Sequence, residues 1–221
     1  MVTEANMTKN MFGRGNSKLV DMGKRLNEKV ITFDMLAGHT CPMAKDCLAR
    51  VMVRNGKKHL QKLGKFTCYA VKAELIYPAV YNLHKANYAR TKRATFVSRA
   101  IREIQKSGAT IVRIHSAGDF YDYTYFQKWV EIAKALPHIK FFGYTKQATF
   151  VNWLVNNPIE NMKIVYSHGG ILDAYAASKN LPTCYVELYD GQYDVPLACD
   201  TVKSDDYEYI MRQESFKIAF H

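Results

Sequence analysis

The stretch from Thr110 to Tyr144, TIVRIHSAGDFYDYTYFQKWVEIAKALPHIKFFGY, decides the fold class of this chain. It begins and ends with short apolar runs, at residues 110–114 and 140–144, and each run predicts a buried strand. Between them, large apolar residues recur at helical spacing and predict a helix over residues 125–136. A strand, a helix of about ten residues and a second strand make a βαβ unit, which favours a parallel sheet.

The same alternation continues on both sides of this stretch. The patterns predict further strands at residues 30–35, 162–166 and 184–188, and further helices at residues 94–107, 150–155 and 171–177. Gly108 stands where the glycine that ends a helix is expected. Five strands are too few for a closed eight-stranded barrel. The expected fold class is therefore α/β, with an open parallel sheet or a partial (β/α) barrel.

The N-terminal part between the first two strands is expected to be helical and basic. Residues 48–58 predict a basic helix, and residues 69–92 predict a helix that Pro78 kinks or interrupts. We expect one β/α domain at residues 30–190, an N-terminal extension at residues 1–29, and a C-terminal tail or cap at residues 191–221.

Composition limits the class of protein. The chain has 221 residues, of which 48% are apolar, so it holds enough apolar material for a sizeable core. We expect no membrane-spanning helix, because no apolar run reaches about 18 residues. The first 17 residues are polar and do not resemble a signal peptide. The five cysteines are an odd number, which argues against a fully paired secreted protein, so we expect a cytoplasmic one.

Positive charge is concentrated in the first half of the chain. Residues 1–108 contain 21 Lys and Arg against 7 Asp and Glu, whereas residues 109–221 contain 10 against 13. A localised basic surface favours a polyanion as partner, most plausibly nucleic acid, although a solvated basic face without a ligand is the alternative. The residues chosen as candidate nucleic-acid contacts are Lys57, Lys58, Arg90, Lys92 and Arg93.

Polar residues follow the predicted strands at their carboxyl ends. Ligands of open parallel sheets and β/α barrels bind at this edge, so a site is expected there. Gly118 follows a strand, where a glycine allows the backbone to approach a ligand closely. Asp119 could also belong to such a site, or it could instead cap the helix that follows. The segment at residues 167–170 resembles a backbone cradle for an anion, or an ordinary turn. The candidate cofactor-binding residues are His115, Ser116, Gly118, Asp119, Lys146, Ser167, His168 and Gly169.

Three cysteines in the first third of the chain predict a metal site. Cys41, Cys47 and Cys68 have the spacing C-x5-C-x20-C, which lacks the paired short spacings of zinc fingers. Soft thiolates suit an iron–sulfur cluster, and three ligands to a four-iron cluster leave one iron open for a substrate or cofactor. Zinc and three simply buried thiols are the alternatives. Cys184 and Cys199 are candidates for a fourth ligand, and each singly is more typical of a structural residue.

Several of these segments together resemble one known family. The resemblance rests on Thr40-Cys41-Pro42, Cys47, Cys68-Tyr69-Ala70, Tyr77-Pro78-Ala79-Val80, residues 112–120 (VRIHSAGDF) and residues 142–146 (FGYTK). The chain resembles a phage and plasmid family usually called the gene product 88 family, over about residues 30–190. That family implies no particular function.

The layout is also similar, more distantly, to radical S-adenosylmethionine enzymes, which place three cysteines after the first strand of a partial β/α barrel. By that resemblance Cys41, Cys47 and Cys68 would hold a four-iron cluster, and Gly118 and Asp119 would lie near the methionine end of S-adenosylmethionine. If the protein is an enzyme, radical chemistry of this kind is the first candidate.

Two other classes of protein stay open at this point. One is a non-catalytic nucleic-acid-binding protein with a structural zinc, and the other is a virion or host-takeover protein with buried cysteines.

Overall fold

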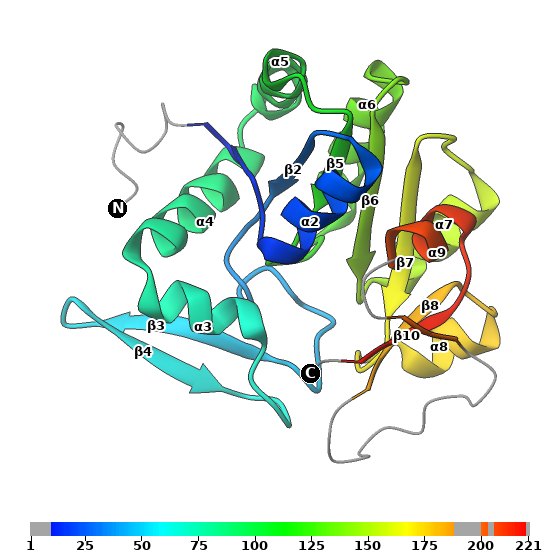
Figure 1. Cartoon of the computed structure of the whole chain (residues 1–221). Coiled ribbons are helices and arrows are strands. Elements are labelled where there is room, and N and C mark those ends of the chain that lie inside the picture. Colours follow the sequence, from blue (N-terminus) through cyan, green and yellow to red (C-terminus); the bar gives the residue numbers. More distant parts are fainter. Residues whose placement is uncertain (1–9, 188–199, 203–205, 220–221) are drawn as a thin grey trace.

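The computed structural model describes residues 10–187, 200–202 and 206–219 (Figure 1). Its main sheet has eight strands in the order β1-β2-β5-β6-β7-β8-β10-β9, and every neighbouring pair is parallel except β1 and β2. The strands are β1 (Phe12–Gly13), β2 (Val30–Phe33), β5 (Ile111–Ile114), β6 (Lys140–Thr145), β7 (Met162–Ser167), β8 (Thr183–Glu187), β9 (Asp200–Val202) and β10 (Phe216–Ala219). The fold is therefore α/β with an open, mostly parallel sheet, which confirms the predicted class.

Helices cover both faces of this sheet. Helices α5 (Phe96–Ser107), α6 (Tyr123–Ala135), α7 (Ala148–Asn156) and α8 (Asp173–Ser178) contribute to the core on one face, which we call the outer face. Helices α2 (Ser17–Leu26) and α9 (Asp206–Arg212) pack on the other, inner face. Side chains of successive strand residues point to opposite faces, so Ile111 packs with α2 and α9 whereas Val112 packs with the outer helices.

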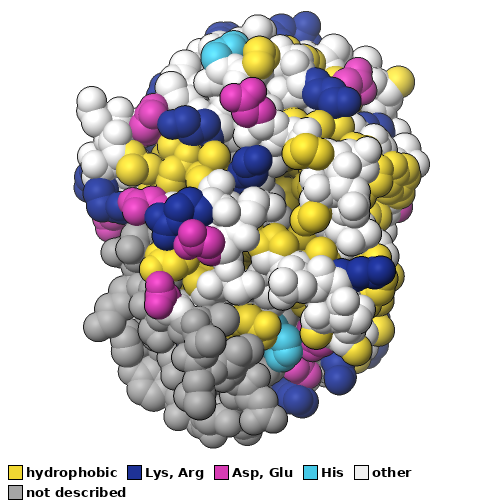
Figure 2. Space-filling model, turned by 90° about the vertical axis from the view of Figure 1, so that its right-hand side faces the viewer, with side chains coloured by type: hydrophobic (Ala, Val, Ile, Leu, Met, Phe, Trp, Pro, Cys, Tyr) yellow, Lys and Arg dark blue, Asp and Glu magenta, His cyan; other side chains and the backbone are white. Residues whose placement is uncertain are grey.

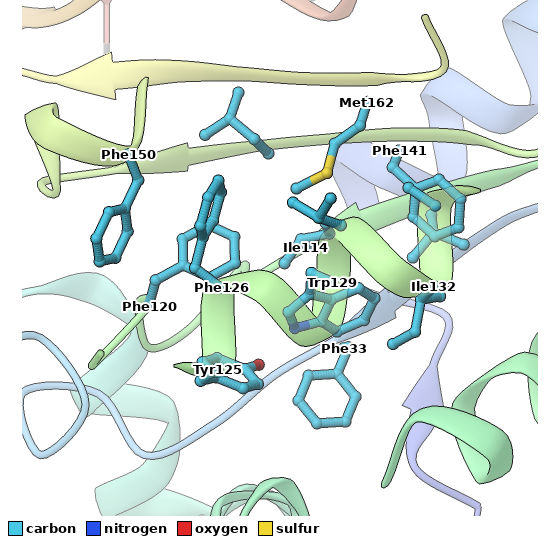
Figure 3. Close-up of a cluster of buried hydrophobic side chains, with 14 of the residues drawn as sticks. Phe33, Ile114, Phe120, Tyr125, Phe126, Trp129, Ile132, Phe141, Phe150 and Met162 are labelled. Atoms are coloured by element: carbon cyan, nitrogen blue, oxygen red, sulfur yellow. The ribbon is translucent and has the colours of Figure 1, made fainter. Parts of the chain in front are cut away.

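Aromatic residues fill the core of the outer face (Figure 3). Trp129 of α6 is fully buried, and its ring lies 5.3 Å from the ring of Phe33, in an edge-to-face arrangement. Phe126 stacks on Phe150 of α7 with ring centroids 4.8 Å apart. Such pairs add about 0.5–1.5 kcal/mol each beyond the area they bury. This core lies on the opposite side of the sheet from α2 and α9 and fixes the strands that end at the candidate site.

The region between β2 and β5 corrects one prediction. Residues 48–58 do not form a helix; they belong to a hairpin of β3 (Ala49–Arg54) and β4 (Lys57–Lys62). Asn55 and Gly56 form the turn with φ of 49° and 73°, the left-handed conformation that two-residue hairpin turns require. The helix prediction was wrong because it followed the basic composition, whereas the Asn55-Gly56 pair favours a two-residue hairpin turn and decides the local structure.

Two helices follow the hairpin, as the sequence predicted. Helix α3 (Tyr69–Ile76) ends before Pro78, and α4 (Pro78–Thr91) begins with it, so the proline marks a boundary rather than a kink. Gly108 ends α5 in the left-handed conformation, as expected. Figure 1 shows α3 lying along the hairpin, at a distance from α5 and α6.

Both ends of the chain contribute to the main sheet. The segment expected as an N-terminal extension supplies β1 and α2, and the segment expected as a tail or cap supplies β9, α9 and β10. Cys199 lies outside the described residues. Among the residues that are described, no helix is long and apolar enough to cross a membrane. On the face shown in Figure 2, Lys and Arg side chains are interspersed with Asp and Glu.

Candidate functional site at the carboxyl edge of the sheet

The fold brings the three N-terminal cysteines together. Cys41 and Cys47 belong to the loop after β2, and Cys68 immediately precedes α3. All three are partly exposed and carry free thiols. They lie within electrostatic range of one another, because Cys68 and Cys47 both raise the pKa of Cys41 and Cys47 raises that of Cys68. Residues from two separate segments therefore share one site, which we call the cysteine site.

Backbone amides face these thiols. The Gly38 amide donates to Cys41 Sγ at 3.3 Å, and the amides of Ala70 and Val71 in the first turn of α3 lower the pKa of Cys68. Burial has the larger effect and raises the pKa of Cys68 to about 11. Amides directed at sulfur, together with the positive end of a helix, stabilise thiolates that bind a metal. The backbone amides thus partly offset the effect of burial on the Cys68 thiol.

Hydrogen bonds and one tight contact hold the cysteine loop in place. Gly169 O accepts from the amides of Lys45 and Asp46 at 3.3 and 3.0 Å, so the loop is joined to the end of β7. At the start of the loop, Gly38 has φ +72° and passes so close to β3 that a Cβ would lie 1.9 Å from Ala49 O. Only glycine fits there, and this position sets the path of the loop toward Cys41.

A buried carboxylate fixes the same loop from the side of the helices. Glu74 of α3 is fully buried, and its Oε1 accepts from the Ala37 amide and shares a bond with His84 Nδ1, both at 2.8 Å. Glu74 also raises the pKa of Cys68. The pair of Glu74 and His84 therefore ties α3, α4 and the cysteine loop to one another.

Asp119 and Gly118 lie at the cysteine site, as the sequence predicted. Asp119 is buried and accepts from Thr145 Oγ1 at 2.6 Å and from the Lys146 amide at 2.9 Å. Burial raises its pKa to about 6 against these bonds, and its charge raises the pKa values of Cys41 and Cys47. Gly118 has φ +86°, and a Cβ there would lie 2.7 Å from Thr40 Oγ1, so the backbone is close to the cysteine loop.

The anion cradle predicted after β7 is already occupied by a side chain of the chain itself. The amides of Gly169 and Gly170 both donate to Asp173 Oδ1 at 3.0 Å, and His168 Nε2 lies 3.5 Å from Asp173 Oδ2. This segment is thus a turn whose amides hold an internal carboxylate, which favours the ordinary turn that the sequence left open as the alternative to a cofactor-binding role for His168 and Gly169.

Lys146 and Ser167 are joined in a clamp between β6 and β7. Lys146 Nζ donates to Ser167 O, Ser167 Oγ and His168 O at 3.0, 3.3 and 2.7 Å. An ammonium group has three donors, so these bonds use all of them. Lys146 therefore positions the two strand ends, rather than binding an anion as expected, and its charge lowers the pKa of Cys47.

The structure also argues against the prediction that His115 binds a cofactor. It adopts φ 62°, which turns its ring into the outer core, where it lies 4.7 Å from the ring of Phe120 and shares a 2.7 Å bond with Tyr125 OH. Burial, helped by Arg113, lowers its pKa to about 3. A neutral imidazole among aromatic rings does not face a ligand at the carboxyl edge.

Three residues at this edge were missed by sequence reasoning. Asp34 follows β2, and its Oδ1 accepts from the amides of Ser116 and Ala117 at 2.6 and 3.0 Å. Arg113 lies within β5 on the inner face, and Tyr69 reaches across from α3 to donate from its hydroxyl to Ser116 O. Arg113 is a charged residue inside an apolar strand, and this pattern in the sequence could have pointed to the group.

The predicted nucleic-acid residues are distributed over the hairpin and α4. Lys57 is exposed in the hairpin, and Lys92 and Arg93 are exposed after α4. Lys58 donates to Glu74 O at 2.6 Å, so it is partly engaged within the protein. The structure argues against the prediction that Arg90 contacts nucleic acid, because this side chain is only 2% exposed and donates to Asn87 Oδ1 at 2.6 Å.

The described residues contain no group of three or more His, Cys, Asp or Glu side chains that could hold a metal ion. A zinc ion needs ligands that converge on one point at about 2.0–2.3 Å. In a four-iron cluster each thiolate binds a different iron, so the sulfurs stand apart around the cluster. Cys184 is no fourth ligand in this arrangement, since it is buried in β8 with the core of the inner face.

The fold and site define an α/β protein with three cysteines, from two segments, at the carboxyl edge of a parallel sheet. The family model of Gene product 88 matches residues 8–218, so the chain belongs to that family. It is similar to the Gene 88 protein of Mycobacterium phage L5, at 29% identity over 111 residues, and to that of Mycobacterium phage D29, at 24% over 161 residues. These matches cover 45% and 65% of this chain, and 46% and 67% of the relatives. The match to the L5 protein thus spans about half the length of that relative. No solved structure matches.

Proposed function

We propose that this protein binds an iron–sulfur cluster, of the four-iron type, through Cys41, Cys47 and Cys68. The observation that supports this most strongly is that three free, partly exposed thiols from two segments lie at one edge of the sheet, with backbone amides directed at Cys41 and Cys68. The spacing of the cysteines lacks the short pairs of zinc fingers, so we favour a cluster over a structural zinc. Free thiols are typical of a reducing cytoplasm, that of the host cell if the protein is phage-encoded.

A three-cysteine cluster would leave one iron without a cysteine ligand, and Asp119 and Gly118 lie at the same site. S-adenosylmethionine is the first candidate for a small molecule at that position, by the similarity of layout to radical S-adenosylmethionine enzymes. The cluster would supply electron transfer to the bound molecule. In this proposal, Gly118 allows close approach of the ligand, and Asp119 accepts a hydrogen bond from it.

Metal and sulfide analysis tests the cluster, on protein purified without oxygen. We expect iron and sulfide in equal amounts and a brown protein. Cys41→Ser, Cys47→Ser and Cys68→Ser should each lower the iron content strongly, whereas Cys184→Ala is a matched control that should keep it. S-adenosylmethionine binding to the loaded protein is then measured by equilibrium dialysis. Zinc at one ion per chain, or iron that survives all three substitutions, would contradict the proposal.

A second candidate function is nucleic-acid binding by the hairpin and α4. Tyr81, Lys85, Tyr88 and Lys92 recur at the spacing of one helix face, and Lys92 Nζ lies 4.1 Å from the ring centroid of Tyr88. Lys58 and Lys85 lie within 5.5 and 6.0 Å of the Tyr81 ring. Basic side chains interleaved with aromatic rings suit phosphates and stacked bases.

Salt dependence tests this second function. Affinity for single-stranded DNA should fall steeply as salt rises, and the double variant Lys85→Gln/Lys92→Gln should reduce the slope by about 1–2 in log–log units. Lys179→Gln, on the other half of the chain, is the control. Binding that does not change with salt, or no binding at low salt, would remove this function.

A further inference from the structure

Arg113 is an unusual residue for the middle of a parallel sheet. It belongs to β5, where it pairs with Thr32 of β2 and Phe142 of β6, and its side chain is 9% exposed on the inner face. Its guanidinium carbon lies 4.2 Å from the ring centroid of Tyr144 and 5.1 Å from that of Phe142. The guanidinium therefore lies over an aromatic surface, which leaves its edge for hydrogen bonding.

The hydrogen bonds that Arg113 makes are few and long. Nε and Nη2 reach only His115 O, at 3.4 and 3.5 Å, and no described carboxylate lies within 4.0 Å of the group. Arginine has five donors, and buried charges in proteins are normally paired. The charge of Arg113 thus lacks the partner that its burial requires.

The carboxylates that share this side of the sheet are engaged elsewhere. Asp206 pairs with Lys18 at 3.1 Å and accepts from Tyr144 OH, and Asp34 Oδ1 accepts from Thr32 Oγ1 at 3.1 Å and from two backbone amides. Neither is placed to neutralise Arg113. The described residues therefore offer Arg113 no ion-pair partner within 4.0 Å.

Tyr69 links Arg113 to the cysteine site. Tyr69 directly follows Cys68 and is 53% exposed. Arg113 reaches His115 O and the Tyr69 hydroxyl donates to Ser116 O, so the two side chains meet adjacent carbonyl groups after β5. A small molecule that reached Arg113 would lie beside the cysteine site.

We propose that Arg113 is the anchor of a binding site for a small molecule with an oxyanion, a phosphate or carboxylate, on the inner face next to the cysteine site. Two in-plane N–H groups of a guanidinium can bind two oxygens of one anion, and Tyr144 holds the guanidinium plane in position. The Tyr69 hydroxyl donates to Ser116 O, next to the His115 carbonyl that Arg113 reaches, so the exposed Tyr69 ring is near enough to contact the remainder of the molecule. The site does not depend on the cluster, so each proposal can fail without the other.

Binding of two simple oxyanions tests the site. Inorganic phosphate and benzoate are titrated separately into the full chain at low salt in a buffer without oxyanions, with calorimetry as the readout. We expect at least one to saturate, and the stronger of the two tells whether the natural ligand carries phosphate or carboxylate. Arg113→Gln should weaken that affinity about tenfold or more, as loss of a charge-assisted hydrogen bond predicts. Lys92→Gln, an exposed control, should leave it unchanged.

Two further variants separate binding from folding and from the cluster. Arg113→Met removes an unpaired charge and keeps an unbranched side chain, so its melting temperature should equal or exceed that of the unmodified protein. Cys41→Ser should lose iron but keep anion binding. No saturable binding of either anion, unchanged affinity in Arg113→Gln, or a clearly lower melting temperature in Arg113→Met would overturn the proposal.

Discussion

At the scale of single residues, position after a strand predicted some site residues and misplaced others. Gly118 and Asp119 do lie beside the cysteine loop, because the chain turns toward β2 as it leaves β5. His115, three residues before Gly118, instead turns its ring into the core of the outer face. Its left-handed backbone, which a sequence pattern does not reveal, reverses the direction of the side chain.

The burial of His115 predicts an acid-sensitive stability. Its pKa is lowered to about 3 in the folded protein from an ordinary value of 6.5, so the unfolded chain binds the proton first. The stabilising effect of the neutral ring is complete above pH 6.5 and is lost progressively as the pH falls toward 3, at up to about 1.4 kcal/mol per pH unit.

Urea unfolding at pH 7 and at pH 5 measures this loss. His115→Asn, which tolerates the left-handed backbone, should be less stable at pH 7 but should lose less stability on acidification. His138→Asn, at an exposed position, is the control and should follow the unmodified protein. Equal losses in all three proteins would show that another group titrates.

At the scale of elements, alternation and helix periodicity predicted the β/α units from residue 94 onward. They failed at the hairpin, where basic residues masked a strand pattern of alternating burial in β3, with Ala49 and Val51 buried and Arg50 and Met52 partly exposed. The Asn55-Gly56 pair was the available signal. Short strands near the chain ends could not be predicted, because β1 and β9 have two and three residues and depend on tertiary pairing.

The Asn-Gly turn yields a prediction for the hairpin as an element. Gly56 has φ 73° and open space around its Cα, so Gly56→Ala adds only backbone strain, about 1 kcal/mol. We expect faster tryptic cleavage after Lys57 and Lys58, with little change in global unfolding. Gly13→Ala is the matched control, since its backbone is extended and a Cβ would meet no atom closer than 3.9 Å. Cleavage at the same rate in both variants would mean that the turn does not limit hairpin opening.

At the scale of the whole molecule, the cysteine site and the aromatic core of the outer face are separate. The aromatic core of the outer face contains no cysteine, and the cysteine loop is held by protein contacts of its own: the Ala44–Gly170 bridge, the Ile171 amide bonded to Met43 O at 2.9 Å, and the Glu74 carboxylate. A zinc finger lacks such support and unfolds without its metal. Sequence alone could not distinguish these cases, because two of these contacts join segments more than 100 residues apart and the third joins residues 37 apart.

Loss of the three thiols, and with them of the cluster proposed to bind there, should therefore leave this protein folded. The triple variant Cys41→Ala/Cys47→Ala/Cys68→Ala should keep the far-ultraviolet circular dichroism of the unmodified protein and a single cooperative unfolding transition. Amide hydrogen exchange should quicken in residues 38–47 and in the first turn of α3, where amides face the thiols, and should stay slow in β5, β6 and β7. This pattern follows because the strands belong to a core on which the thiols do not act. A triple variant without a cooperative transition would instead make the metal a folding element, as the structural-zinc alternative requires.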